Sequence, residues 1–149
     1  IYTEGSEENK NFCNNVEVGV VVSRREAVVA GQTDLLLRHK DGRFWLVDYK
    51  FCGGKKLERE VGRFGSFGKG PLSKVPDNSY GHYLAQQSAY AFILKRRYDV
   101  AVCRSSLLHV PTDETPVVPR LLDLELLSDE TVVAMFDARG RDLTRLNEK

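Results

Sequence analysis

Two opposite charges lie two residues apart in a short segment with the composition of a β-strand, residues 46–51 (LVDYKF). Because side chains alternate along a strand, Asp48 and Lys50 share one face. The other face carries an apolar set, which we expect to anchor the strand in the core: Val47, Tyr49 and Phe51. Burying an unpaired charge costs several kcal/mol, so Asp48 and Lys50 need a mutual ion pair, a metal ion or a ligand phosphate.

A second carboxylate, Asp34, precedes Asp48 by fourteen residues in another strand-like run. Asp41-Gly42 between them is a strong signal for a tight turn, and an antiparallel register can then bring the two carboxylates side by side. Like charges at close range repel unless one of them is protonated or a cation lies between them. A hard divalent cation with oxygen ligands is the economical solution.

This donor set suits Mg²⁺, which prefers octahedral oxygen ligands and keeps several waters. Asp34, Asp48 and one backbone carbonyl would leave coordination positions for water and for a phosphate oxygen. Lys50 beside such an ion would position or help to deprotonate the attacking water, and its charge would oppose the charge that develops on a phosphoryl group. The pattern therefore predicts hydrolysis of a phosphodiester bond.

An acid-x-Lys triplet alone is a weak signal, because a chain of this length has about an even chance of containing one. Glu8-Asn9-Lys10 has the same pattern within a polar stretch, and we assign it no role. Taken without their neighbours, Asp48 and Lys50 are equally compatible with a plain ion pair in a structural domain.

Apolar periodicity and turn signals predict seven elements in the order β-β-β-α-β-β-α, an α/β domain. The strands are expected at 16–23, 28–38, 43–51, 100–110 and 120–126, and the helices at 83–98 and from Ser128 to Leu146. Ser128 is a suitable N-cap, and the two acids after it suit the positive end of a helix. The first three strands are expected to form an antiparallel meander.

The chain has 149 residues, of which 42% are hydrophobic, enough for one domain with a core. We expect a flexible leader over 1–15 and a single domain over 16–149. The lack of an initiator methionine indicates a piece of a longer protein, and no segment has the length and apolarity of a membrane span. Three widely spaced cysteines fit reduced thiols and an intracellular protein better than a disulfide framework.

The net charge of +1 hides a basic middle section. Residues 18–76 contain twelve Lys and Arg against six acids, and a Gly-rich stretch within them, 53–76, is expected to be a long mobile loop. Its basic residues, interleaved with Phe64 and Phe67, would suit single-stranded DNA through ion contacts and base stacking, or would simply form a solvated linker. The basic residues in question include Lys55, Lys56, Arg63 and Lys69.

Three sequence features occur together in a known family. GQTDLLL at 31–37, VDYK at 47–50 and Gln86-x-x-x-Tyr90 in the helical segment YLAQQSAYAFIL resemble the PD-(D/E)xK nuclease superfamily, in particular its RecB-like exonuclease branch. The resemblance extends over residues 16–110. The Gly-rich stretch before the helix is also similar to that of nuclease domains from large DNA viruses and protists.

The resemblance implies a restriction-endonuclease-like mixed β-sheet core flanked by helices, and a Mg²⁺- or Mn²⁺-dependent deoxyribonuclease. It implies an exonuclease acting on single strands or ends of DNA. The alternative is a non-catalytic module of the same fold that binds nucleic acid. The implied metal ligands are Asp34, Asp48 and the Tyr49 carbonyl.

Further roles follow from the same resemblance. Lys50 would serve the attacking water, and Gln86 and Tyr90, on one helix face, would help to position the DNA. Without the aspartates, Gln86 and Tyr90 would read as ordinary helix packing. Glu17 is a candidate for a further metal ligand, or an exposed strand residue. The family core usually begins with a helix that contributes a metal ligand, and residues 1–15 do not have the pattern of that helix.

Overall fold

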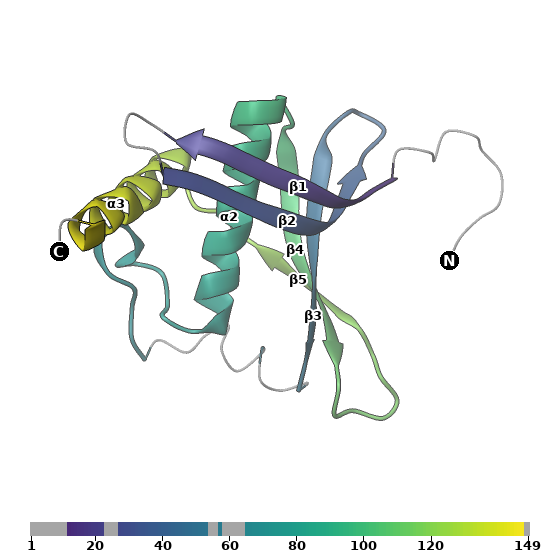
Figure 1. Ribbon diagram of the computed structural model, residues 1–149. Helices are drawn as coiled ribbons and strands as arrows, with labels where there is room; N and C mark the ends of the chain where they lie inside the picture. The colour runs from purple at the N-terminus through teal and green to yellow at the C-terminus, as the bar shows by residue number, and fades with distance from the viewer. Residues whose placement is uncertain (1–11, 23–26, 54–56, 58–64, 148–149) are drawn as a thin grey trace.

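A computed structural model of the chain describes residues 12–22, 27–53, 57 and 65–147 (Figure 1). The elements are β1 (Phe12–Val22), β2 (Ala27–Arg38), β3 (Phe44–Cys52), the 3-10 helix η2 (Gly70–Leu72), α2 (Ser79–Tyr98), β4 (Val102–Pro111), β5 (Arg120–Leu124) and α3 (Asp129–Asn147). The five strands form one sheet in the order β1-β2-β3-β4-β5. The predicted fold class, a mixed α/β sheet with flanking helices, is confirmed.

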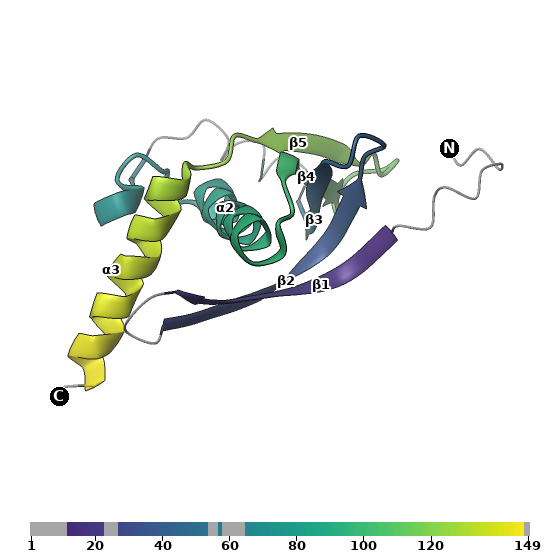
Figure 2. The same ribbon diagram turned by 90° about the horizontal axis from the view of Figure 1, so that it is seen from above.

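The meander is antiparallel, as predicted, but β2 accompanies β3 over only a short distance. The ladder between β2 and β3 runs from Leu35 opposite Val47 to Arg38 opposite Phe44. The earlier part of β2 stays paired with β1, and the two strands curve together away from β3 and across α2 (Figure 2). β2 and β3 therefore separate like a fork, and α2 lies beside the opening.

β3 and β4 are parallel and are connected through α2, which makes the central unit a β-α-β crossover. Since the strands are parallel, their carboxyl ends lie at the same edge of the sheet, and α2 begins near that edge (Figure 1). β5 returns antiparallel to β4. Among the described strands, the second half of β3 is therefore paired with β4 alone and lies at the fork where β2 separates from β3, with α2 nearby.

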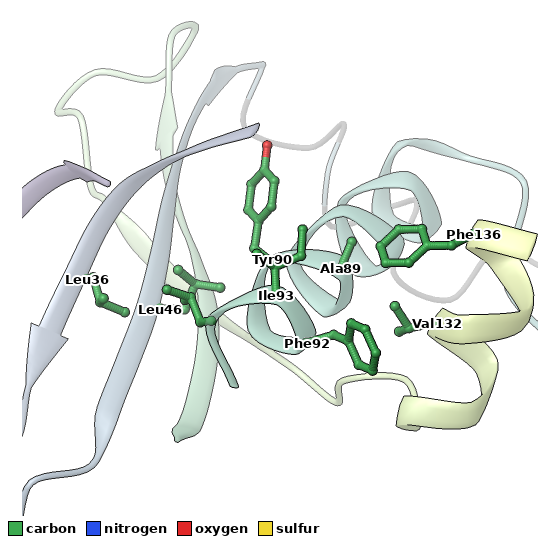
Figure 3. Close-up of a cluster of buried hydrophobic side chains, with 9 residues drawn as sticks. Leu36, Leu46, Ala89, Tyr90, Phe92, Ile93, Val132 and Phe136 are labelled. Carbon is green, nitrogen blue, oxygen red and sulfur yellow. The ribbon is translucent and has the colours of Figure 1, made fainter. Parts of the chain in front are cut away.

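The helix α2 packs between the sheet and α3 (Figures 2 and 3). Ile93 and Ala89 on α2 share a buried cluster with Leu46 of β3 on one side and Phe136 of α3 on the other. The helix begins at Ser79, four residues before the predicted start, because Asn78 caps it by accepting a hydrogen bond from the Gly81 amide at 2.9 Å.

The face of β3 that was expected to be buried is the more open one. Tyr49 and Phe51 are 38% and 68% exposed, whereas Asp48 is only 4% exposed and Leu46 is fully buried. Alternation had predicted correctly which residues share a face, but the covering helix packs on the face that carries the charges. Val47 is buried all the same. The expectation that Tyr49 and Phe51 anchor the strand in the core is therefore wrong.

Two other boundaries differ from the prediction. β1 begins at Phe12, so residues 12–15 of the predicted leader belong to a strand, while residues 1–11 lie outside the described part. Within the predicted mobile loop, residues 65–76 include η2, a bridge between Phe67 and Pro76, and the buried Val75. This part of the loop is therefore packed against the domain, with η2 beside α3.

The start of α3 agrees with the prediction. Ser128 Oγ accepts a hydrogen bond from the Thr131 amide at 3.3 Å, and Asp129 and Glu130 occupy the first turn. Among the residues that the structure describes, no helix is long and apolar enough to cross a membrane.

Candidate active site

Asp34 lies where β2 separates from β3. The last ladder pair before the separation is Leu35 with Val47, so Asp34 would stand opposite Asp48 if the register continued. Beyond this pair, a side-chain hydrogen bond replaces the backbone ladder. Asp34 Oδ2 accepts a hydrogen bond from the Tyr49 amide at 2.8 Å. Because the N–H and C=O of one residue point to the same edge of an extended strand, the Tyr49 carbonyl also faces the Asp34 side.

Asp48 is the most deeply buried acidic side chain among the described residues, at 4% exposure. Lys50 Nζ forms an ion pair with its Oδ2, and that oxygen has no other partner in the described part of the chain. Asp34, which is hydrogen-bonded to the backbone amide of the next residue, Tyr49, is close enough to Asp48 to influence its carboxylate. Asp34 and Asp48 thus lie near each other at the end of the β2–β3 ladder, and their joint role as metal ligands stays a prediction.

Burial raises the pKa of Asp48, and the neighbouring Asp34 raises it further. Lys50 acts in the opposite direction through its hydrogen bond and its charge, yet the net pKa shift is upward. The surroundings of Asp48 thus disfavour its charge despite the ammonium beside it. A second cation between the two carboxylates would remove this imbalance.

The Lys50 ammonium has a second neighbour. It lies 4.4 Å from the ring centroid of Tyr83, which is in the first half of α2. The Lys50 side chain is only 19% exposed. The ammonium is thus held between a carboxylate of its own strand and an aromatic ring of the helix.

Gln86 and Tyr90 lie one turn apart on α2, and Gln86 Nε2 donates a hydrogen bond to the Tyr90 hydroxyl at 3.0 Å. Tyr90 is 9% exposed and belongs to the main core cluster. A Cβ added at Gly31 would lie 2.3 Å from Tyr90 Cε1, so the ring packs directly on the β2 backbone. Figure 3 shows the Tyr90 ring pointing from α2 toward the strands.

This packing explains why a glycine precedes Asp34 in the sequence. The contact between Tyr90 and Gly31 holds β2 against α2 three residues before the carboxylate. The structure thus shows a packing role for Gln86 and Tyr90. A contact of this pair with nucleic acid stays a prediction.

The remaining predicted residues are less informative. Lys69 is exposed and directly precedes η2. Glu17 stands opposite Gln32 in the ladder between β1 and β2, but its side chain lies outside the described part. Lys55, Lys56 and Arg63 lie outside the described residues altogether. Within the described ranges, no group of three or more His, Cys, Asp or Glu side chains gathers where it could hold a metal ion.

Two neighbours of the site were not singled out from the sequence. Tyr83 is one, and its spacing of three residues from Gln86 could have placed it on the same helix face. His109 is the other: it is fully buried, it pairs with Lys50 in the parallel ladder, and its Nε2 lies 3.1 Å from the Cys52 carbonyl. No sequence signal identified His109, because its position depends on the register between β3 and β4.

No protein-family model matches the chain, and no curated protein matches it either. The crystal structure of SSO0001 superposes with a TM-score of 0.54 and 15% identity, over 92% of this chain and 53% of that one. The crystal structure of "Putative exonuclease" from Eubacterium rectale gives a TM-score of 0.49 and 13% identity, over 89% of this chain and 45% of that one. The chain thus spans about half the length of either solved protein. The likeness to SSO0001 shows a shared fold.

Proposed function

We propose that this domain is a Mg²⁺- or Mn²⁺-dependent deoxyribonuclease. The observation that carries the proposal is the proximity of Asp34 and Asp48 at the fork between β2 and β3, where Asp34 binds the Tyr49 amide and Lys50 contacts Asp48. A structural ion pair would need one acid and one base. Here a second acid, Asp34, lies beside the Asp48–Lys50 pair, and the burial of Asp48 makes the surplus negative charge costly.

The donor set fits a hard divalent cation. Asp34 and Asp48 supply carboxylate oxygens, and the Tyr49 carbonyl faces the same side of β3. The cation, when bound, would polarise a phosphate oxygen and lower the pKa of a bound water. Glu17 could add a ligand from β1.

The side chains of the domain then have separable tasks. Asp34 fixes the Tyr49 backbone through its hydrogen bond and so holds the end of the β2–β3 ladder in register. Lys50 would orient the attacking water and oppose the charge that develops on the phosphoryl group. The Tyr90 ring packs against Gly31 and keeps β2 and α2 at a fixed separation. This packing also fixes the position of Asp34.

DNA is the proposed substrate, as single strands or ends. The basic middle section of the chain, the exposed Lys69 and the resemblance to RecB-like exonucleases support this choice. Exposed Phe67, two residues before Lys69, would add a stacking surface for an unpaired base.

The test is incubation of labelled single- and double-stranded DNA with Mg²⁺, Mn²⁺ or EDTA. We expect cutting that requires the metal and that falls at least about a hundredfold in Asp48→Ala and in Lys50→Ala, because each removes a group at the reacting phosphate. Lys95→Ala is the matched control, since Lys95 forms an exposed ion pair with Asp129 at 2.8 Å on the far part of α2.

Metal-independent cutting, or equal rates in the wild type and Asp48→Ala, would refute the assignment. Binding of DNA without cutting under any metal would instead favour the non-catalytic module.

A further inference from the structure

Lys50 is a cation with two partners of different kinds. One is the Asp48 carboxylate, and the other is the Tyr83 ring at 4.4 Å. An aromatic face attracts a cation through its quadrupole and uses no carboxylate oxygen to do so. The two partners therefore differ in what they leave available for a second cation.

The Tyr83 ring is fixed in place by the protein. It packs against a buried cluster that includes Leu84 of its own helix, Leu107 of β4 and Val75 of the loop before α2. Leu107 is also the ladder partner of Asp48. The ring thus stands on a rigid base next to the site, whereas Lys50 is a long side chain that can move between positions.

The Asp48 carboxylate that Lys50 contacts is also a proposed metal ligand. Asp48 Oδ2 is the oxygen that Lys50 contacts, and under the proposed function Asp48 also binds a divalent cation. Two cations would then compete for one buried carboxylate. If Lys50 had no second partner, its contact with Asp48 would weaken metal binding by that carboxylate. If Lys50 left Asp48 instead, nothing would hold its ammonium in place.

We infer that Tyr83 is a positioning residue that holds the Lys50 ammonium at the reacting phosphate when Asp48 turns to the metal. This inference rests on the proposed function and deepens it. The stripe Tyr83, Gln86 and Tyr90 along α2 then has two anchoring ends. Tyr90 fixes β2 through Gly31, and Tyr83 fixes the ammonium of β3.

A purely structural role for Tyr83 gives different expectations, because any large side chain that fills the cluster would serve. Tyr83→Phe keeps the aromatic face, and Tyr83→Leu removes it while remaining apolar. Tyr83→Met is a second variant without a ring, with a flexible side chain that fills irregular gaps. Tyr80→Leu is the matched control, because Tyr80 is on the same helix and packs against the same cluster.

The first measurement is cutting of single-stranded DNA under steady-state conditions. We expect Tyr83→Phe to stay within about twofold of the wild type and Tyr83→Leu and Tyr83→Met to lower kcat about tenfold with KM nearly unchanged. Tyr80→Leu should keep the wild-type kcat. In the Lys50→Ala background, Tyr83→Leu should cause no further loss, since the ammonium that it positions is gone.

The second measurement is Mn²⁺ binding by calorimetry in the absence of DNA. We expect Tyr83→Leu to weaken Mn²⁺ binding severalfold, because Lys50 is then left with Asp48 alone, and Tyr83→Phe to leave it unchanged. The Lys50→Ala background should abolish the difference. Equal losses of kcat and affinity with and without Lys50, or an equal loss in Tyr80→Leu, would overturn the inference.

The two proposals can fail separately. If the wild type cuts no DNA with any metal, the proposed function fails, while the Mn²⁺ affinities still decide whether Tyr83 acts through Lys50. If cutting depends on Asp48 and Lys50 but both Tyr83 variants without a ring behave as the wild type, the nuclease assignment stands and the role of Tyr83 is refuted.

Discussion

Two acid–base pairs on the same sheet have opposite electrostatics. On β3, burial and Asp34 raise the pKa of Asp48 although Lys50 contacts it. Between β4 and β5, hydrogen bonds from Arg104 and then Ser106 lower the pKa of Asp123. Arg104 reaches both Asp123 oxygens, at 3.0 and 2.9 Å, and the pair is exposed.

The difference distinguishes an ion pair in a candidate binding site from an ion pair with a purely structural role. The hydrogen bonds to Asp123 stabilise its charged form. Asp48 has one ammonium and a like-charged neighbour and is almost completely buried, so its charged form destabilises the folded state. Ionisable groups whose charged form is disfavoured in this way are typical of functional sites, for example where a bound cation compensates the charge.

The largest difference between the pairs is expected in stability at neutral pH without divalent metal. Asp48→Asn should raise the free energy of unfolding, because it removes a charge that its surroundings disfavour while Lys50 keeps the Tyr83 ring. Asp123→Asn should lower it by about 0.5 kcal/mol, as expected for an exposed pair. Urea denaturation measures both values. A clear loss of stability in Asp48→Asn would show that the Asp48–Lys50 pair is a structural brace after all.

A smaller effect is expected in the pH dependence of these differences. The folded-state pKa of Asp48 lies above its unfolded value, so protonated Asp48 costs nothing, and the penalty develops as the pH rises from the ordinary Asp pKa through the raised one. The advantage of Asp48→Asn should therefore vanish in acid. For Asp123 the pKa is lowered, so its contribution exists above the ordinary Asp pKa and is lost as the pH falls through the folded value. Denaturation curves at several pH values would reveal these opposite trends, and parallel trends would contradict the comparison.

Much of the fold could be predicted from the sequence because local signals and global topology agree. The Asp41-Gly42 turn and the apolar runs around it set the register in which Leu35 stands opposite Val47, one residue short of Asp34 and Asp48. The helix pattern placed Gln86 and Tyr90 on one face, where they are hydrogen-bonded to each other. These features depend on residues close in sequence, and such patterns carry that information.

The burial of the two faces of β3 could not be predicted in the same way. Alternation identifies the residues that share a face, but the covered face is decided by where α2 packs. Hydrophobicity favoured Tyr49 and Phe51 as the buried pair, whereas the helix covers Leu46 and Asp48. The contact between Tyr83 and Lys50 was missed for a related reason, since it joins two elements separated by a long connection.

The most direct test of the central claim is a crystal structure of the protein soaked in Mn²⁺, with anomalous diffraction to locate the ion. We predict one strong anomalous peak between the carboxylates of Asp34 and Asp48, with the Tyr49 carbonyl in reach and the Lys50 ammonium still over the Tyr83 ring. An Asp48–Lys50 ion pair left intact at saturating Mn²⁺, with no peak at the fork between β2 and β3, would contradict it.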